Sequence, residues 1–159
     1  MRFSNSDSAW LAHVCSMPAA RARQQIAWLG NILSSRGMPQ LLLERHLMIM
    51  REELVAAVPE RRRVYSALTR NARHLKNARL EAIPARKAAS IAAMFMKAAP
   101  RLWLERIPEM GSLLVAAVAD ERNGIERAVH SIEEWVYDKE RFPQSWILAA
   151  RNAIAAARE

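Results

Sequence analysis

Residues 39–58 read PQLLLERHLMIMREELVAAV, and this stretch decides the fold class. If the chain turns by about 100° per residue, as in an α-helix, its apolar side chains cover more than half of the helix circumference. Only two narrow polar seams, which begin at Glu44 and Arg45, interrupt them. Such a helix is stable in water only when neighbours cover it from at least two directions. The stretch therefore predicts a central helix inside a helical bundle.

The composition of the whole chain also favours helices. Its 159 residues suffice for one domain with a substantial core. The chain is 52% apolar with only four glycines, and Ala, Leu, Arg and Glu dominate where a strand-rich protein would alternate Val, Ile, Thr and Tyr. We predict an all-α fold, a single helical domain over residues 1–159 with six or seven helices. Residues 1–8 are a candidate disordered segment.

Prolines and glycines mark the expected helix ends. Gly37 ends a helix that begins near Pro18, and Pro39 begins the central helix, so a tight turn should join two antiparallel helices. Pro59 ends the central helix. Later helices are expected over residues 60–80, 84–99 and 102–107 and in the apolar run 110–119. Asp120 is expected to be the N-cap of the next helix, and a last helix begins at Pro143.

Residues 107–135 also suggest an alternative architecture. They resemble one HEAT-type repeat, with two antiparallel helices, Pro108 near the start, Asp120 at the turn and Arg127 in the second helix. A solenoid needs several such units, and no second copy occurs at a fixed period. A short HEAT-like solenoid is therefore kept only as the alternative to the bundle.

Positive charge is concentrated in the middle of the chain. The net charge is +8, and residues 60–101 hold eleven Lys and Arg against two Glu. In the helix expected over residues 60–80, Val64, Leu68 and Leu75 mark the buried stripe. The opposite side and the start of the next helix carry the predicted partner-binding residues, which are Arg62, Arg63, Arg70, Arg73, Lys76, Arg86 and Lys87.

Such a one-sided basic surface indicates an anionic partner, either an anionic macromolecule or an acidic protein surface. A basic helix face is also an ordinary aid to solubility, and that interpretation stays open. No helix-turn-helix or zinc-finger pattern accompanies the basic residues, and their face carries no aromatic side chain for base stacking. The leading hypothesis is a non-catalytic interaction module that binds through residues 60–87.

The central helix carries a second candidate site. His46 and Glu53 lie two turns apart within its wide apolar arc, with Met50 between them. Buried polar groups of this kind need partners, so the pair is either a hydrogen-bonded link in the core or part of a ligand site. The alternative function is thus a small-molecule- or cofactor-binding bundle, a sensor or an enzyme, centred on His46 and Glu53.

Specific catalytic and metal signatures are missing. The sequence contains no Glu-x-x-His, His-Glu-x-x-His or CxxC pattern and no glycine-rich phosphate loop, so we predict no catalytic residue and no metal ligand and assign no cofactor. Cys15 is the only cysteine, which fits a reducing compartment. No apolar run is long enough to span a bilayer. We expect a soluble, cytoplasmic protein.

Overall fold

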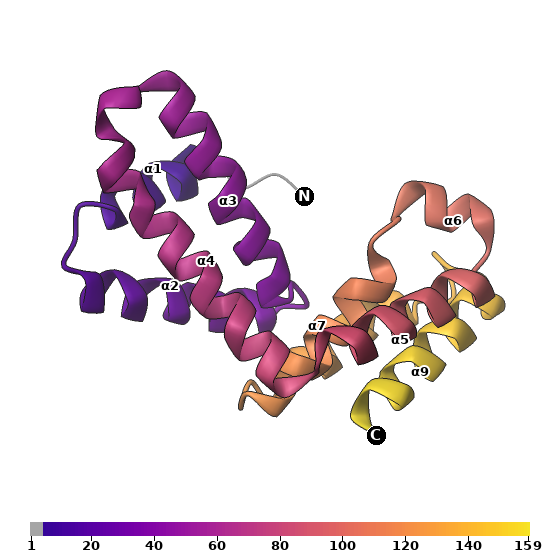
Figure 1. Cartoon of the computed structure of the whole chain (residues 1–159). Helices are drawn as coiled ribbons and strands as arrows, with labels where there is room; N and C mark the ends of the chain where they lie inside the picture. Colours follow the sequence, from indigo (N-terminus) through magenta and orange to yellow (C-terminus); the bar gives the residue numbers. More distant parts are fainter. Residues whose placement is uncertain (1–4) are drawn as a thin grey trace.

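The computed structural model describes residues 5–159, and these residues form helices joined by turns (Figure 1). The described part of the chain contains no strand, so the all-α prediction is confirmed. Nine α-helices and one short 3-10 helix are present in it, more than the six or seven expected. They are α1 Asn5–Val14, α2 Ala19–Ser34, α3 Gln40–Ala57, η1 Pro59–Arg61, α4 Arg62–Ala82, α5 Ala85–Ala98, α6 Arg101–Arg106, α7 Met110–Arg122, α8 Ala128–Val136 and α9 Gln144–Arg158.

The disorder expected for residues 1–8 concerns the start of α1 and the residues before it. Residues 1–4 lie outside the described residues, whereas α1 begins at Asn5. The disorder expected for residues 1–8 stays a prediction. Within the described chain, no helix combines the length and the apolar character needed to cross a membrane.

The tight turn predicted between α2 and α3 is present. Gly37 has φ +77°, a conformation that a glycine adopts without the strain a side chain would cause. A side chain there would also collide with α8, because its Cβ would lie 2.7 Å from the carbonyl oxygen of Ser131. Beyond the turn, however, α2 diverges from α3, and the antiparallel pair that lies side by side is α3 with α4 (Figure 1).

Buried side chains form two hydrophobic clusters. The first cluster is built by α1 to α4 and includes Leu11, Ile26, Leu43, Leu47 and Leu68. The second is built mainly by α5 to α9 and includes Phe95, Leu114, Ile132, Trp146 and Ile154. Leu41 and Leu42 of α3 pack against the second cluster, so α3 takes part in both.

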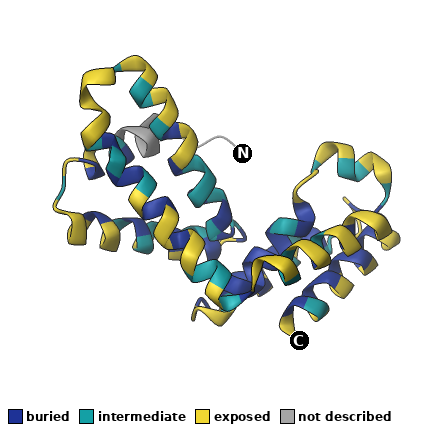
Figure 2. Ribbon diagram, in the orientation of Figure 1, coloured by how far each residue is buried: buried dark blue, intermediate teal, exposed yellow. Residues whose placement is uncertain are grey.

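The central helix of the bundle is α7, not α3. Every residue from Met110 to Asp120 is buried except Ser112, which is half-buried (Figure 2). In α3, by contrast, Met48 and Ile49 are exposed, and Ile49 keeps 55% of its accessible surface. The prediction that residues 39–58 form a helix is confirmed, but the prediction that this helix is enclosed on nearly every side is wrong.

Small side chains explain why α7 can be enclosed. Gly111 allows α5 to approach so closely that an added Cβ would lie 2.9 Å from the carbonyl oxygen of Ala92. Three alanines continue this thin helix at positions 116, 117 and 119. Helix α7 packs against α3, α4, α5, α8 and α9. A solenoid unit contacts only its neighbours in the chain, so the bundle describes this fold and the HEAT-like alternative does not.

Asp120 joins α7 to the α2–α3 turn. The residue was expected to begin a helix, but it lies within α7 and is only 1% exposed. Its Oδ2 atom accepts hydrogen bonds from the Ser34 hydroxyl at 2.7 Å and from the backbone N–H of Gln40 at 2.8 Å. Gln40 is the first residue of α3, so a carboxylate from another helix caps α3. Burial raises the pKa of Asp120 from its ordinary value of 3.8 to about 6.

Candidate functional site

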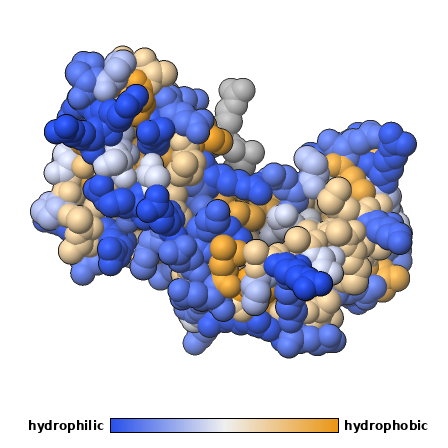
Figure 3. Space-filling model, viewed as in Figure 1, coloured by the Kyte–Doolittle hydropathy of each residue, from blue (hydrophilic) through white to orange (hydrophobic). Residues whose placement is uncertain are grey.

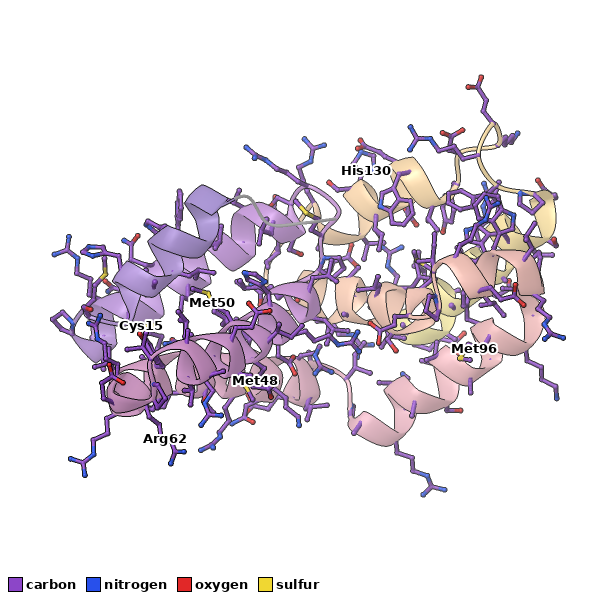
Figure 4. All side chains as sticks on the ribbon, turned by 90° about the horizontal axis from the view of Figure 1, so that it is seen from above. Cys15, Met48, Met50, Arg62, Met96 and His130 are labelled. Carbon is purple, nitrogen blue, oxygen red and sulfur yellow. The ribbon has the colours of Figure 1, made fainter. Side chains whose placement is uncertain are left out.

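Helix α4 presents the predicted basic residues on one side. Its buried side chains, which include Tyr65, Leu68 and Leu75, pack in the first cluster. The opposite side carries five exposed cations, which we call the α4 basic face: Arg62, Arg63, Arg70, Arg73 and Lys76. On the face of the molecule drawn in Figure 3, hydrophilic residues predominate over α4, and Figure 4 shows Arg62 on the outside of this helix. The structure therefore brings these five predicted residues together.

The α4 basic face has no carboxylate partner among the residues that the structure describes. None of the ion pairs between described residues includes a member of it. Arg70 donates a hydrogen bond of 2.7 Å to the hydroxyl of Ser66, a neutral group on the same helix. Within the described residues, these guanidinium and ammonium groups therefore lie at the surface without an ion-pair partner.

Arg79 provides the contrast within the same helix. Its guanidinium donates to both carboxylate oxygens of Glu44 on α3, with N–O distances of 2.8–3.1 Å. The two side chains are only 18% and 13% exposed. A bidentate pair with this little exposure fixes α4 against α3. One arginine of α4 is thus used for packing, whereas the α4 basic face is not.

Arg86 and Lys87 continue the positive charge into α5. They stand in its first turn, after Pro84, with Arg86 exposed and Lys87 half-buried. The first turn of α4 likewise contains Arg62 and Arg63 and no acidic residue. Cations are unfavourable near a helix N-terminus because its backbone N–H groups already carry partial positive charge. Helix stability therefore does not account for these residues.

The second predicted site is not assembled as expected. Met50 is buried in the first cluster, and His46 is half-buried. Glu53 is exposed, so the interpretation of His46 and Glu53 as a buried pair is wrong. The apolar arc around Glu53 predicts burial, but Ile49, Ala56 and Ala57 in that arc are exposed as well.

His46 instead lines a groove of about 800 Å³, which we call the α3–α8 groove. The α2–α3 turn, α3, the start of α7 and α8 form its walls. Its apolar lining includes Leu42, Ile49, Met110, Leu113, Ile132 and Trp135. Both hydrophobic clusters contribute side chains next to it, so it lies where the two clusters meet. Large side chains of α3, α7 and α8, among them Ile49, Met110 and Trp135, line this space.

Cations, and no carboxylate, line the α3–α8 groove alongside these apolar residues. Arg36, Arg45 and Arg141 contribute to its wall together with His46. Arg45 forms an ion pair with Glu109, and the Nε of Arg141 lies 3.0 Å from Oδ2 of Asp138. Arg36 is exposed and takes part in no ion pair with a side chain of residues 10–159.

Sequence reasoning missed most residues of this groove. Arg36 is far in the chain from Trp135 and Arg141, and no local pattern connects it with them. The useful signal was the apolar arc of α3, which is too wide for one packing surface. Part of that arc, including Ile49, faces the groove rather than a neighbouring helix.

The remaining titratable residues form no larger constellation. His130 on α8 lies with its Nε2 3.1 Å from Oε1 of Glu134, and both side chains are more than half exposed (Figure 4). Over the described range, no three His, Cys, Asp or Glu side chains are arranged to hold a metal ion. Cys15 is buried, its thiol donates to the carbonyl oxygen of Leu11 at 3.4 Å, and desolvation raises its pKa.

Comparison with known proteins finds no matching family model, no matching curated protein and no matching solved structure. The function is therefore inferred from the residues and geometry of the chain itself.

Proposed function

We propose that this chain is a non-catalytic interaction module that binds an anionic macromolecule through the α4 basic face, extended by Arg86 and Lys87. The observation that carries the proposal is the contrast within α4. Arg79 is paired with Glu44, whereas the five cations of the α4 basic face are exposed and have no carboxylate partner among the described residues. Groups of one sign that the fold leaves uncompensated are available to a partner of the opposite sign.

The shape of the face fits an extended partner. From Arg62 to Lys76 the helix rises by about 21 Å, because each residue adds about 1.5 Å. Guanidinium groups along such a rod suit phosphates or carboxylates that repeat along a chain, since each can bind them in a bidentate manner. Tyr65, the aromatic residue of α4, is buried and not available for stacking on bases. We therefore expect recognition of charge and shape rather than of nucleotide sequence.

A charge-matched pair of variants tests the proposal. In the first variant, Arg62, Arg70 and Arg73 are replaced by alanine. In the second, the exposed residues Arg101, Arg106 and Arg151 are replaced, which lowers the net charge equally but leaves the α4 basic face intact. Binding is measured by titration against three probes, which are duplex DNA, poly-glutamate and vesicles containing anionic phospholipid.

We expect the wild type to bind at least one probe with an affinity that decreases as salt increases. The first variant should lose about tenfold or more in affinity, since each charged contact contributes on the order of 1 kcal/mol or less at an exposed site. The second variant should keep an affinity within about twofold of the wild type. The probe that binds identifies the partner class. The proposal fails if the wild type binds none of them or if both variants lose affinity equally.

The α3–α8 groove supports a second candidate function, binding of a small molecule. Its volume of about 800 Å³ falls in the range of ligand sites, and His46 from the alternative hypothesis lines it. Glu53 does not contribute to its wall. Native mass spectrometry of the protein purified from cells tests this function, because a ligand in the groove adds a defined mass that is lost on unfolding.

A further inference from the structure

We infer that the α3–α8 groove binds a small amphipathic monoanion, a molecule with an apolar body and a single carboxylate. The inference rests on the second candidate function above and is independent of the α4 basic face. No residue of α4 lines the groove, so a ligand there would not cover the basic face.

The apolar lining determines the body of the ligand. Ile49 is 55% exposed although it faces the groove, and Trp135 is only half-buried there. An apolar molecule in the groove would remove both side chains from water, which is the main source of affinity in such sites. Apart from its three arginines and His46, the lining side chains are apolar, so a highly polar body such as a sugar would lose more hydrogen bonds to water than it could regain.

The charges at the wall determine the sign of the head group. Three arginines and a histidine line the groove, and no Asp or Glu in the described part of the chain does. Two of the arginines are already held by carboxylates, Arg45 by Glu109 and Arg141 by Asp138. Arg36 has no such partner among the described residues, so the structure assigns the carboxylate of the ligand to Arg36. A cationic head group beside Arg36 would meet a like charge that no ion pair among the described residues offsets.

Decanoate, decan-1-ol and decylamine provide a matched set of probes. They share an alkyl chain and differ in the charge of the head group. Binding to the wild type is measured by isothermal titration calorimetry below the concentrations at which these molecules aggregate. We expect decanoate to bind most tightly, decan-1-ol more weakly, and decylamine weakest of the three.

Two variants locate the site. Ile49→Glu places a negative charge in the groove and should lower decanoate affinity by more than tenfold. Its control is Leu102→Glu, which replaces an apolar residue of similar exposure, 59%, that does not line the groove. Arg36→Gln should lower decanoate affinity by about tenfold and leave decan-1-ol affinity unchanged, because only the charge-assisted hydrogen bond is removed. All three positions are exposed, and thermal melts establish that the variants fold.

Four results would overturn the inference. The first is equal affinity for decanoate and decan-1-ol in the wild type, or an unchanged decanoate affinity in Arg36→Gln. The second is an equal loss in Leu102→Glu and Ile49→Glu. The third is a change of sedimentation in Ile49→Glu without any ligand, which would show that a second copy of the chain occupies the groove. The fourth is loss of decanoate binding in the triple arginine variant of α4.

If that variant loses only polyanion binding, both proposals stand. If polyanions fail to bind while the decanoate results hold, only the proposed function of the α4 basic face fails.

Discussion

Helices α3 and α7 are both rich in apolar residues, yet only α7 is enclosed. The apolar residues of α3 are mostly Leu, Met and Ile, whereas α7 combines a few large residues with Gly111 and several alanines. Five helices approach α7 closely. On α3, some of the large apolar side chains line the α3–α8 groove, and some remain exposed to solvent.

The difference shows that side-chain size, as well as hydrophobicity, decides which helix becomes the centre of a bundle. A thin helix lets several neighbours reach van der Waals contact at once, because interiors are close-packed. Helix α3 packs against α4 along one side, and on another side its large side chains line the α3–α8 groove together with residues of α7 and α8. The same comparison therefore separates a structural helix from a candidate binding helix.

The largest expected effect compares two truncations. Leu114 on α7 is fully buried, so Leu114→Ala should lower the free energy of unfolding by about 2–5 kcal/mol through lost burial and a new cavity. Ile49→Ala on α3 should cost less than about 1 kcal/mol because the side chain is already more than half exposed. Urea denaturation of both variants measures the difference. Equal costs would show that α7 is no more enclosed than α3.

The next effect concerns the carboxylate that links the two helices. Because burial raises the pKa of Asp120 to about 6 in the folded protein, protonation favours the folded state. Its contribution to stability is therefore largest at low pH and decreases as the pH rises from about 4 to about 6, by about 3 kcal/mol. Asp120→Asn keeps an oxygen that accepts from Ser34 and Gln40 but does not ionise. The stability difference between wild type and Asp120→Asn should change across this pH window, and parallel stability curves would contradict the assignment.

A smaller effect compares two glycines. Gly111→Ala should destabilise by about 1–3 kcal/mol, because its Cβ would meet the backbone of Ala92 at 2.9 Å. Gly30→Ala in α2 meets only the side chain of Gln40, also at 2.9 Å, which can move away. It should be close to neutral or slightly stabilising, since alanine favours the helix by about 1 kcal/mol over glycine. If Gly111→Ala melts at the wild-type temperature, close helix contact does not explain the enclosure of α7.

The smallest effect on stability is expected for the α4 basic face. Replacing Arg62, Arg70 and Arg73 together by alanine should change the free energy of unfolding by less than about 1 kcal/mol, because these side chains are exposed and have no ion-pair partners in the described part of the chain. Arg79→Ala is the matched comparison and should cost clearly more, since it leaves the carboxylate of Glu44 partly buried and unpaired. Chemical denaturation curves of the two variants give the comparison.

The sequence was sufficient for the fold class, most helix ends and the basic face. Proline and glycine positions predicted the α2–α3 turn and the end of α3, and the period of Val64, Leu68 and Leu75 correctly separated the buried from the exposed side of α4. These features depend on local periodicity and backbone chemistry, which a single segment contains. The position of α7 at the centre depends on contacts with five other helices, which no single segment contains.

Two polar residues show the same limit. Asp120 was expected to be the N-cap of the helix that follows it in the chain, because an Asp before an apolar stripe is a common N-cap. Instead it caps α3 from a distance of 80 residues in the chain. Glu53 was expected to be buried because its neighbours on the helix are apolar, but it is exposed, as are Ile49, Ala56 and Ala57. Hydropathy predicts which faces are apolar, while the packing of distant helices decides which of those faces are covered.

The salt dependence of polyanion binding tests the central proposal most directly. The logarithm of the dissociation constant is plotted against the logarithm of salt concentration for the tightest-binding probe, with wild type, the triple variant of Arg62, Arg70 and Arg73, and the charge-matched triple variant. If the α4 basic face contacts the partner, the triple variant should show a smaller slope. For duplex DNA the slope should be lower by about two to three, because each lost phosphate contact lowers it by about 0.9. The charge-matched variant should keep the wild-type slope. Equal slopes in wild type and the triple variant would contradict the proposal.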